Sequence, residues 1–304
     1  MTATSTTPQA PPRPGLSRRI AAWLHPHRRL QAFLLLGGPL GWLTIAYFGA
    51  LFILLLNAFW EKDEFTGNVI PFSWSLDAVE ELLSNPVYRT ITIRTMGIAA
   101  AVAVADIILA FPLAYYAARL ARPRVRALIL VAVVLPLWSS YLVKAYAWST
   151  ITAPKGVADA FLGLVGIPEG TLGSSQWAIW LTFCYLWLPF VILPIYASLE
   201  RVPSSYLEAS SDLGARGWKT FRHVVWPLSI PGVVAGSIFA FSLTLGDYIA
   251  PTIVGNTKFI GNVIYDSVGV ANNLPLAAAF ALVPVAIMAI YLALAKRLGA
   301  FEAL

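Results

Sequence analysis

The chain has 304 residues, of which 58% are hydrophobic and only 12% are charged, and its formal net charge is +6. A soluble globular domain carries roughly a quarter charged residues, so this composition excludes an ordinary soluble domain and indicates an integral membrane protein. The single cysteine, Cys184, excludes a disulfide framework and a cysteine-rich metal site.

Six apolar windows are long enough to cross a bilayer as helices, which takes about 20 residues each. In chain order they cover residues 33–59, 91–118, 127–152, 176–199, 229–254 and 275–295. They are too long and too uniformly apolar for barrel strands, whose polarity alternates with period two. The predicted fold is therefore an all-α integral membrane bundle of six transmembrane helices.

Residues 1–32 are predicted to form a cytoplasmic tail that is rich in proline at its start and carries five Arg residues from Arg13 onward. The first window, residues 33–59, is too long for the apolar region of a secretory signal, and no small-residue cleavage site follows it. It is therefore predicted to be retained as the first transmembrane helix.

The basic residues lie at the edges of the apolar windows, which predicts orientation in a bilayer rather than binding to nucleic acid. Lys and Arg in short connections prefer the cytoplasm, and they gather in the tail, in residues 119–126, around residues 201–222 and at Lys296 and Arg297. Residues 60–90 contain six acidic residues and only two basic ones, Lys62 and Arg89, and are predicted to form an extracytoplasmic loop. Both termini are thus expected on the cytoplasmic side of the membrane.

Residues 204–227 form the most polar long stretch in the second half of the chain. Ser205 and Glu208 have the spacing of a capping box, and Gly214 is placed to end this helix in a left-handed conformation. A second short helix is predicted near Trp218–Trp226. Taken by itself, this pattern indicates a well-capped cytoplasmic loop.

The stretch EASSDLGARGWKTFRHVVWP resembles the EAA loop of ABC-importer permeases. Glu208, Ala209, Gly214 and Pro227 match that pattern at its spacing, and Ser210 replaces the second alanine. In the family, this loop docks on an ATP-binding subunit and carries its closure into the membrane helices. The residues to which the resemblance gives this coupling role are Glu208, Ala209, Ser210, Leu213 and Gly214.

Two further stretches, LPLWSSYLVKAYAW (135–148) and LGDYIAPTIVGNTKFIGNVIYD (245–266), resemble the B-type permease of spermidine and putrescine importers. The resemblance implies that residues 91–298 form the type-1 transmembrane domain of such an importer. It also implies a second permease, two ATP-binding subunits and an extracytoplasmic substrate-binding protein as partners. Importers of opines, phosphonates or other small charged solutes share much of the pattern, so they stay an alternative.

No phosphate loop of the form GxxxxGK followed by Ser or Thr occurs in the sequence. The chain is therefore predicted to be a non-enzymatic subunit that binds no cofactor or metal, with ATP and Mg held by the partner ATPase. An ion-driven secondary transporter is disfavoured because no internal repeat is evident. A membrane enzyme is disfavoured because neither HExxH nor GxSxG occurs.

A charge near the bilayer centre costs about 2.5–3.5 kcal/mol, so intramembrane charges should face a partner or a cavity. Lys144 and Asp247 have similar predicted depth, so they could pair, and the alternative is that Asp247 binds a cationic solute. Asp106 has no evident partner. The candidate residues for a substrate path are Asp247, Tyr248, Asp106, Lys144, Tyr141 and Trp138.

Aromatic residues near a membrane boundary can belong to an interfacial belt or form part of a cage for an ammonium group. Gly232 and Gly236 form a GxxxG pattern in the fifth window, which favours close packing against another helix, including one of a second permease.

Overall fold

The computed structural model describes residues 28–63, 68–164, 166, 168, 170–173 and 175–297, with side chains from residue 35 onward. The chain divides into two compact units, Met1–Leu54 and Leu55–Leu304. Most of the predicted N-terminal tail lies outside the described residues. The first predicted span is a helical segment, Leu35–Phe59, long and apolar enough to cross a membrane. Its elements are α2 (Arg28–Trp42), the π-helical η1 (Leu43–Phe48), α3 (Gly49–Leu56) and the 3-10 turn η2 (Asn57–Phe59).

The predicted loop 60–90 contains secondary structure that its sequence did not reveal. Two short strands, β1 (Trp60–Lys62) and β2 (Val69–Trp74), pair in the antiparallel direction. Helix α4 (Asp77–Ser84) follows, and acidic side chains at Asp77 and Glu80 suit the positive end of its dipole. This loop therefore folds into a small structured cap.

The second predicted span is the long helix α5 (Pro86–Tyr115), which begins at Pro86 rather than at residue 91. The Asn85 side chain accepts a hydrogen bond from the Val87 backbone N–H at 2.9 Å, and Pro86 occupies the first helical position, where its missing N–H has no cost. The helix continues through a π-helical segment, η3 (Tyr116–Leu120). Polar capping thus starts this helix earlier than hydropathy suggests.

The third predicted span is apolar enough to cross a membrane, but it is broken rather than one straight helix. It consists of α6 (Pro123–Val134), the 3-10 turn η4 (Leu135–Trp138), α7 (Tyr141–Thr152) and α8 (Val157–Leu164). The axis bends by 97° at the break between Trp138 and Tyr141.

A proline and a serine account for this break. Pro136 lacks the N–H that a continuous α-helix would use there, and its ring crowds the preceding turn. The Ser139 hydroxyl then donates to the Pro136 carbonyl at 2.7 Å, which competes with continuation of the helix. Hydropathy alone cannot detect such a break because the residues on both sides are apolar.

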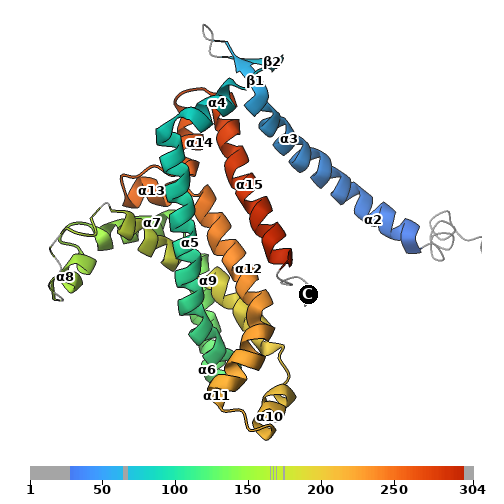
Figure 1. Ribbon diagram of the computed structural model, residues 1–304, viewed down its shortest axis with the longest axis vertical. Coiled ribbons are helices and arrows are strands. Elements are labelled where there is room, and N and C mark those ends of the chain that lie inside the picture. The colour runs from blue at the N-terminus through green and yellow to red at the C-terminus, as the bar shows by residue number, and fades with distance from the viewer. Residues whose placement is uncertain are drawn as a thin grey trace, which may run out of the picture. The chain divides into compact units, whose positions relative to one another are not determined.

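The fourth span is α9 (Gln176–Glu200), and the sixth is α15 (Leu274–Arg297), close to their predicted bounds. The fifth differs from prediction because its α-helix, α12 (Trp226–Gly246), ends eight residues before residue 254. Two shorter helices follow, α13 (Ile249–Val254) and α14 (Ile260–Gly269). Helices α5, α9 and α12 pack against one another and form the main core of Leu55–Leu304 (Figure 1).

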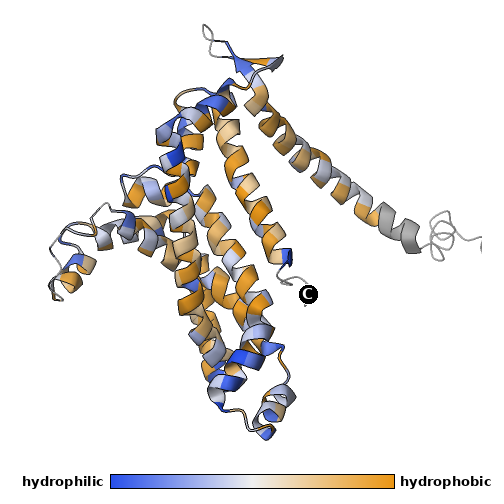
Figure 2. Cartoon of the chain, in the orientation of Figure 1, coloured by the Kyte–Doolittle hydropathy of each residue, from blue (hydrophilic) through white to orange (hydrophobic). Residues whose placement is uncertain are grey.

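Close approach between α9 and α12 depends on the two glycines of the GxxxG pattern. A Cβ atom at Gly232 would lie 2.5 Å from the Pro194 carbonyl oxygen, and one at Gly236 would lie 3.0 Å from the Val191 Cα. The predicted close packing is confirmed, and the partner is α9 of the same chain. Figure 2 shows hydrophobic residues along the long helices and hydrophilic residues gathered at α4 and around α10–α11.

Candidate functional site

The predicted coupling stretch begins with a short helix, α10 (Ser204–Asp212), followed by a glycine turn. Gly214 has φ of +77°, its N–H bonds the Ser211 carbonyl at 2.9 Å, and the Ala215 N–H bonds the Ser210 carbonyl at 3.0 Å. This pair of bonds is a Schellman motif, for which glycine is the favoured residue. The predicted left-handed cap at Gly214 is confirmed.

The predicted capping box at Ser205 and Glu208 was wrong. The extended backbone of a helix cap falls at Pro203, which has no side-chain donor or acceptor, and α10 begins at Ser204 without a side-chain cap. Ser205 is therefore already helical, and a capping residue must lie outside the helix.

The predicted separate second helix was also wrong. Helix α11 (Gly217–Thr220) and the π-helical η5 (Phe221–Val225) run without a break into α12, so that Gly217–Gly246 is one long helix. As a result, α10 is connected to two long helices. Helix α10 is joined to α9 by Arg201–Pro203 on one side and to the fifth span by a tight turn on the other.

Most side chains of α10 face outward. Leu213 is 88% exposed, Tyr206 is 52% exposed, and Glu208 and Ala209 are also exposed. Ser210 is the exception among the predicted coupling residues, because it is buried and its hydroxyl lies 2.9 Å from the Thr220 hydroxyl. Ser210 thus fastens α10 to α11, and its neighbours present an open surface.

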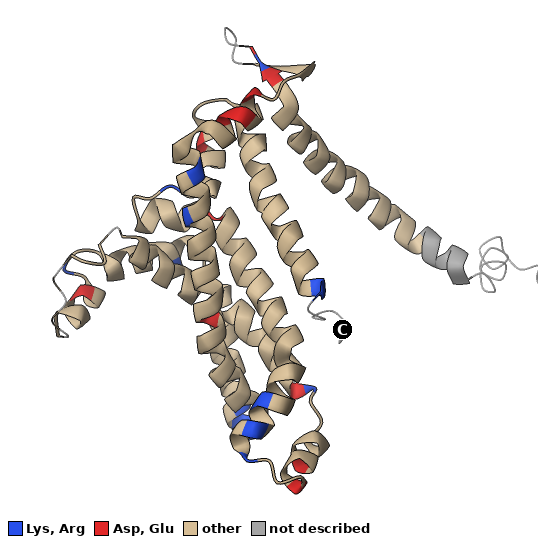
Figure 3. Cartoon of the chain, in the orientation of Figure 1, with Lys and Arg blue, Asp and Glu red and all other residues tan. Residues whose placement is uncertain are grey.

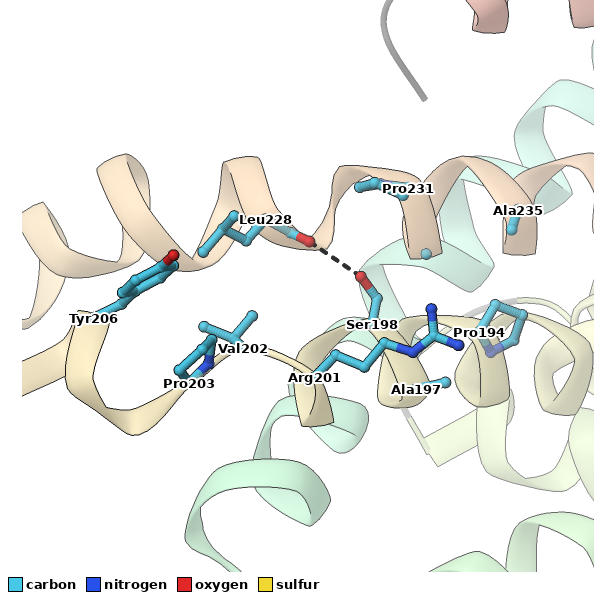
Figure 4. Close-up of a pocket in the computed structure, with 11 residues that line it drawn as sticks. Pro194, Ala197, Ser198, Arg201, Val202, Pro203, Tyr206, Leu228, Pro231 and Ala235 are labelled. Carbon is cyan, nitrogen blue, oxygen red and sulfur yellow. Dashed lines mark hydrogen bonds between the residues drawn. The ribbon is translucent and has the colours of Figure 1, made fainter. Parts of the chain in front are cut away.

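Behind α10 lies a pocket of about 290 Å³ between the ends of α9 and α12. Figure 4 shows Tyr206 and Pro203 on one side of it and Leu228 and Pro231 of α12 facing Ala197 and Pro194 of α9. The Ser198 hydroxyl donates to the Leu228 carbonyl at 3.1 Å and links the two helices across the pocket. The side chains of α9, α10 and α12 therefore do not fill the space beside α10.

The loop from α5 to α6 is bonded to the end of α9. Arg119 donates to the Leu199 and Val202 carbonyls, each at 2.5 Å, and Arg126 forms an ion pair with Glu200 at 2.7 Å. The sequence signalled these arginines only as a basic loop, and their partners could not be identified from the pattern.

Asp247 lies in the break between α12 and α13 and has hydrogen bonds on both carboxylate oxygens. One oxygen accepts the backbone N–H groups of Ile249 at 2.8 Å and Ala250 at 3.0 Å, and the other accepts the Tyr141 hydroxyl. Asp247 thus caps the first turn of α13 and joins it to Tyr141, the first residue of α7; Asp247 and Tyr141 form the joint between α13 and α7. An aspartate directly before a short apolar segment is a typical helix-cap signal, which could have revealed this role.

The predicted pair between Lys144 and Asp247 was wrong. Lys144 instead donates to the Pro136 carbonyl at 3.2 Å, within its own broken span. Similar depth was inferred by counting residues along straight helices, and the 97° bend in the third span removes the basis for that count.

The other candidate path residues differ from one another in exposure and in their contacts. Trp138 is 90% exposed, and Tyr248 stacks on Tyr265 with 4.7 Å between ring centroids. Tyr141 stacks on the buried Trp187 at 6.0 Å. Asp106 is fully buried, and its carboxylate oxygens have no hydrogen-bond partner among the described residues. That the six candidates line a substrate path stays a prediction.

In the part of the chain that the structure describes, no group of three or more His, Cys, Asp or Glu side chains is placed to hold a metal ion.

Residues 110–300 match the family model described as the inner membrane component of binding-protein-dependent transport systems. The chain is 49% identical to the inner membrane ABC transporter permease protein YdcU of Escherichia coli K12, over 97% of this chain and 98% of that protein. It is 28% identical to the spermidine/putrescine transport system permease protein PotB of the same organism, over 74% and 82% of the two chains.

Two solved structures share the fold. A bacterial ABC transporter that imports the acidic polysaccharide alginate matches with a TM-score of 0.62 at 16% identity, over 92% of this chain and 99% of that chain. The alginate transporter in complex with its alginate-bound periplasmic protein matches with a TM-score of 0.64 at 16% identity, over 91% and 97% of the chains. The chain therefore belongs to the family of binding-protein-dependent transport system inner membrane components, is a multi-pass inner membrane permease subunit of an ABC importer, and has the type I importer permease fold.

Proposed function

We propose that this permease forms, with a second permease, the path by which polyamines such as spermidine and putrescine enter the cell. Two separate ATP-binding subunits, which hold ATP and Mg, would drive the cycle, and an extracytoplasmic binding protein would deliver the solute. The observation that carries the proposal is α10, a short helix that joins two long spans and presents an open surface.

The surface of α10 and α11 supports docking to another protein. Leu213, Tyr206 and Trp218 expose 88%, 52% and 70% of their area, and apolar groups gathered in a polar segment favour cover by a partner. Exposed Glu208 and Ala209 lie on the same short helix. Because α10 is joined to α9 by only three residues, Arg201–Pro203, and is fastened to α11, closure of an ATP-binding subunit against it would move both spans.

The polyamine assignment is supported by similarity to PotB, whose name includes spermidine and putrescine. The side chains are compatible with a cationic solute. Tyr248 and Trp138 are exposed aromatic residues, and aromatic faces attract ammonium groups. Asp247 stands beside Tyr248 in sequence and would hold its segment in place. Complete burial of Asp106 keeps it out of this proposed surface.

The proposed orientation places α10 and both termini in the cytoplasm. Figure 3 shows Lys and Arg residues gathered near α6 and α11, and Asp and Glu residues gathered near α4 and β1. Basic residues in short connections favour the cytoplasmic side, and acidic residues contribute little to orientation.

The solute assignment can be tested with the complete importer reconstituted in lipid vesicles. We expect spermidine or putrescine, added with the binding protein, to stimulate ATP hydrolysis and to accumulate inside the vesicles. Molybdate serves as a control anion, because a molybdenum permease is a more distant relative, 28% identical over 57% of this chain. Stimulation by molybdate and not by polyamines would contradict the assignment.

The coupling role has its own test. We expect Glu208→Lys to leave the protein at its normal level in the membrane and to lower the amount of solute moved per ATP hydrolysed. Asp266→Lys is a matched acid-to-base control at the opposite end of the bundle, where Asp266 forms an exposed ion pair with Lys258. Equal behaviour of the two variants would count against coupling through α10.

A further inference from the structure

Two arginines bind the last turn of α9, directly before the segment that leads to α10. Arg119 donates to the Leu199 and Val202 carbonyls, which lie where a helix leaves its final carbonyls without partners inside the helix. A guanidinium is a suitable group here because it offers several donors, and its charge suits the negative end of the helix dipole. Arg119 therefore fixes the end of the second span to the end of the fourth.

Arg126, in the first turn of α6, makes the second connection. Its guanidinium forms an ion pair with Glu200 at 2.7 Å, and the Tyr196 hydroxyl also donates to Glu200 at 2.9 Å. The Arg126 and Glu200 side chains are 35% and 48% exposed. An ion pair so exposed adds little to stability, so its position is its more informative property.

The position links α10 to the broken third span. Three residues, Arg201–Pro203, separate Glu200 from the start of α10. On the other side of the ion pair, α6 leads to the break at Ser139 and Ser140. Figure 1 shows that α6 begins at the end of the bundle that carries α10 and α11.

The broken span is also held at its far side. Tyr141 opens α7, directly after the break, and its hydroxyl bonds Asp247 at the end of the fifth span. The break is therefore held between two fixed points, one on α9 and one on α13. A movement of the α9 end that reaches Arg126 would shift α6 against an α7 that is held by Asp247.

We propose that Arg119 and Arg126, the arginine clamp, are positioning residues that pass the displacement of α10 to the broken third span. The inference rests on the proposed coupling role of α10 and adds the route by which that movement reaches a span to which α10 is not joined. Neither arginine contacts solute or nucleotide in this account.

Charge exchange across the Arg126–Glu200 pair tests the clamp. The variants are Arg126→Glu, Glu200→Arg and the two combined, in the complete reconstituted importer, and the readout is solute moved per ATP hydrolysed. We expect each single variant to lower this ratio about threefold or more, in line with mutations along coupling networks. The combined variant should recover at least half of the loss because the ion pair is restored with reversed polarity.

Arg124→Glu is the matched control, since it places the same charge reversal on the same helix at an exposed residue. Arg119→Gln should lower the ratio as well, and Arg119→Lys should recover part of it because an ammonium group can still donate to a carbonyl. If a charge-reversed single variant fails to assemble, Arg126→Gln and Glu200→Gln with their combination provide the same cycle without reversal, and the combination should then fall no further than either single variant.

The outcomes separate the clamp from the wider proposal. Single variants that behave like Arg124→Glu, or a combined variant that recovers nothing, would overturn the clamp. If Glu208→Lys still uncouples transport in that case, the docking role of α10 stands without it. If Glu208→Lys has no effect either, the proposed coupling role fails as well.

Discussion

The α10 end of the bundle and the joint at Asp247 differ in how their side chains are used: those at α10 are exposed, and those at the joint are bonded within the chain. At α10, Leu213 and Glu208 face outward, and the predicted side-chain cap is absent. At the joint, both carboxylate oxygens of Asp247 accept hydrogen bonds from the same chain. The open α10 surface is what the proposed docking role requires, whereas the joint fixes the geometry of the chain itself.

The largest effect is expected from Gly214→Pro, which acts on the open region. Proline is confined to φ near −65° and has no N–H, whereas Gly214 has φ of +77° and donates to Ser211. Proline therefore cannot adopt the left-handed turn that closes α10, so we expect transport to fall more than tenfold with a normal level in the membrane. Gly217→Ala, at the start of α11 with open space around its Cβ position, is the control and should transport normally.

The next largest effect is expected from Gly232→Ala, in the seam where α9 and α12 pack closely against each other. Its methyl group would lie 2.5 Å from the Pro194 carbonyl oxygen, so α9 and α12 must separate. Overpacking of this kind lowers the free energy of unfolding by about 1–3 kcal/mol. We expect it to appear as a lower midpoint of unfolding in detergent. Gly97→Ala meets no atom within 4 Å and should be neutral or slightly stabilising. Equal midpoints for both variants would mean that the seam is not closely packed.

Two substitutions of Asp247 distinguish the contribution of its hydrogen bonds from that of its negative charge. Asp247→Ala removes the cap of α13 and the partner of Tyr141, and loss of a cap alone costs about 0.5–2 kcal/mol. Asp247→Asn keeps an acceptor and a hydrogen-bonding group, so we expect it to retain most of the transport rate while Asp247→Ala loses most of it. A transport rate in Asp247→Asn as low as in Asp247→Ala would show that the negative charge itself is needed.

The smallest effect is expected from Tyr141→Phe. The substitution removes one hydroxyl from the joint and leaves the ring stacked on Trp187, so the expected loss is about 0.5–1.5 kcal/mol of stability. Combined with Asp247→Ala, it should add less than its separate effect because the two residues share a bond. Full additivity in the unfolding free energies would contradict the joint.

The sequence predicted the two regions unequally for physical reasons. Hydropathy identified the spans, and the left-handed Gly214 followed from its position at the end of a short predicted helix. The helix break at Pro136 and the end of α12 at Gly246 were missed because hydropathy reports burial rather than continuity. The pair of Lys144 with Asp247 failed for the same reason, since depth was counted along helices that the structure shows to be broken.

Side-chain partners across helices were the least predictable features. Nothing in the basic loop indicated that Arg119 and Arg126 bind the end of α9, because such contacts depend on the packing of three helices. The capping box at Ser205 failed because the helix cap falls at Pro203, two residues earlier. The EAA-type spacing carried information that local physics did not, and it led to α10 as the candidate coupling surface.

The most direct test of the account is a cross-link between α10 and the ATP-binding subunit of the purified importer. Cys184 is the only cysteine and is buried, so Leu213→Cys introduces a single accessible thiol at a residue that is 88% exposed. Leu164→Cys, in α8 at 83% exposure, is the matched control. The account predicts a cross-link to the ATP-binding subunit from residue 213 and none from residue 164. No cross-link from residue 213, or equal cross-links from both, would contradict it.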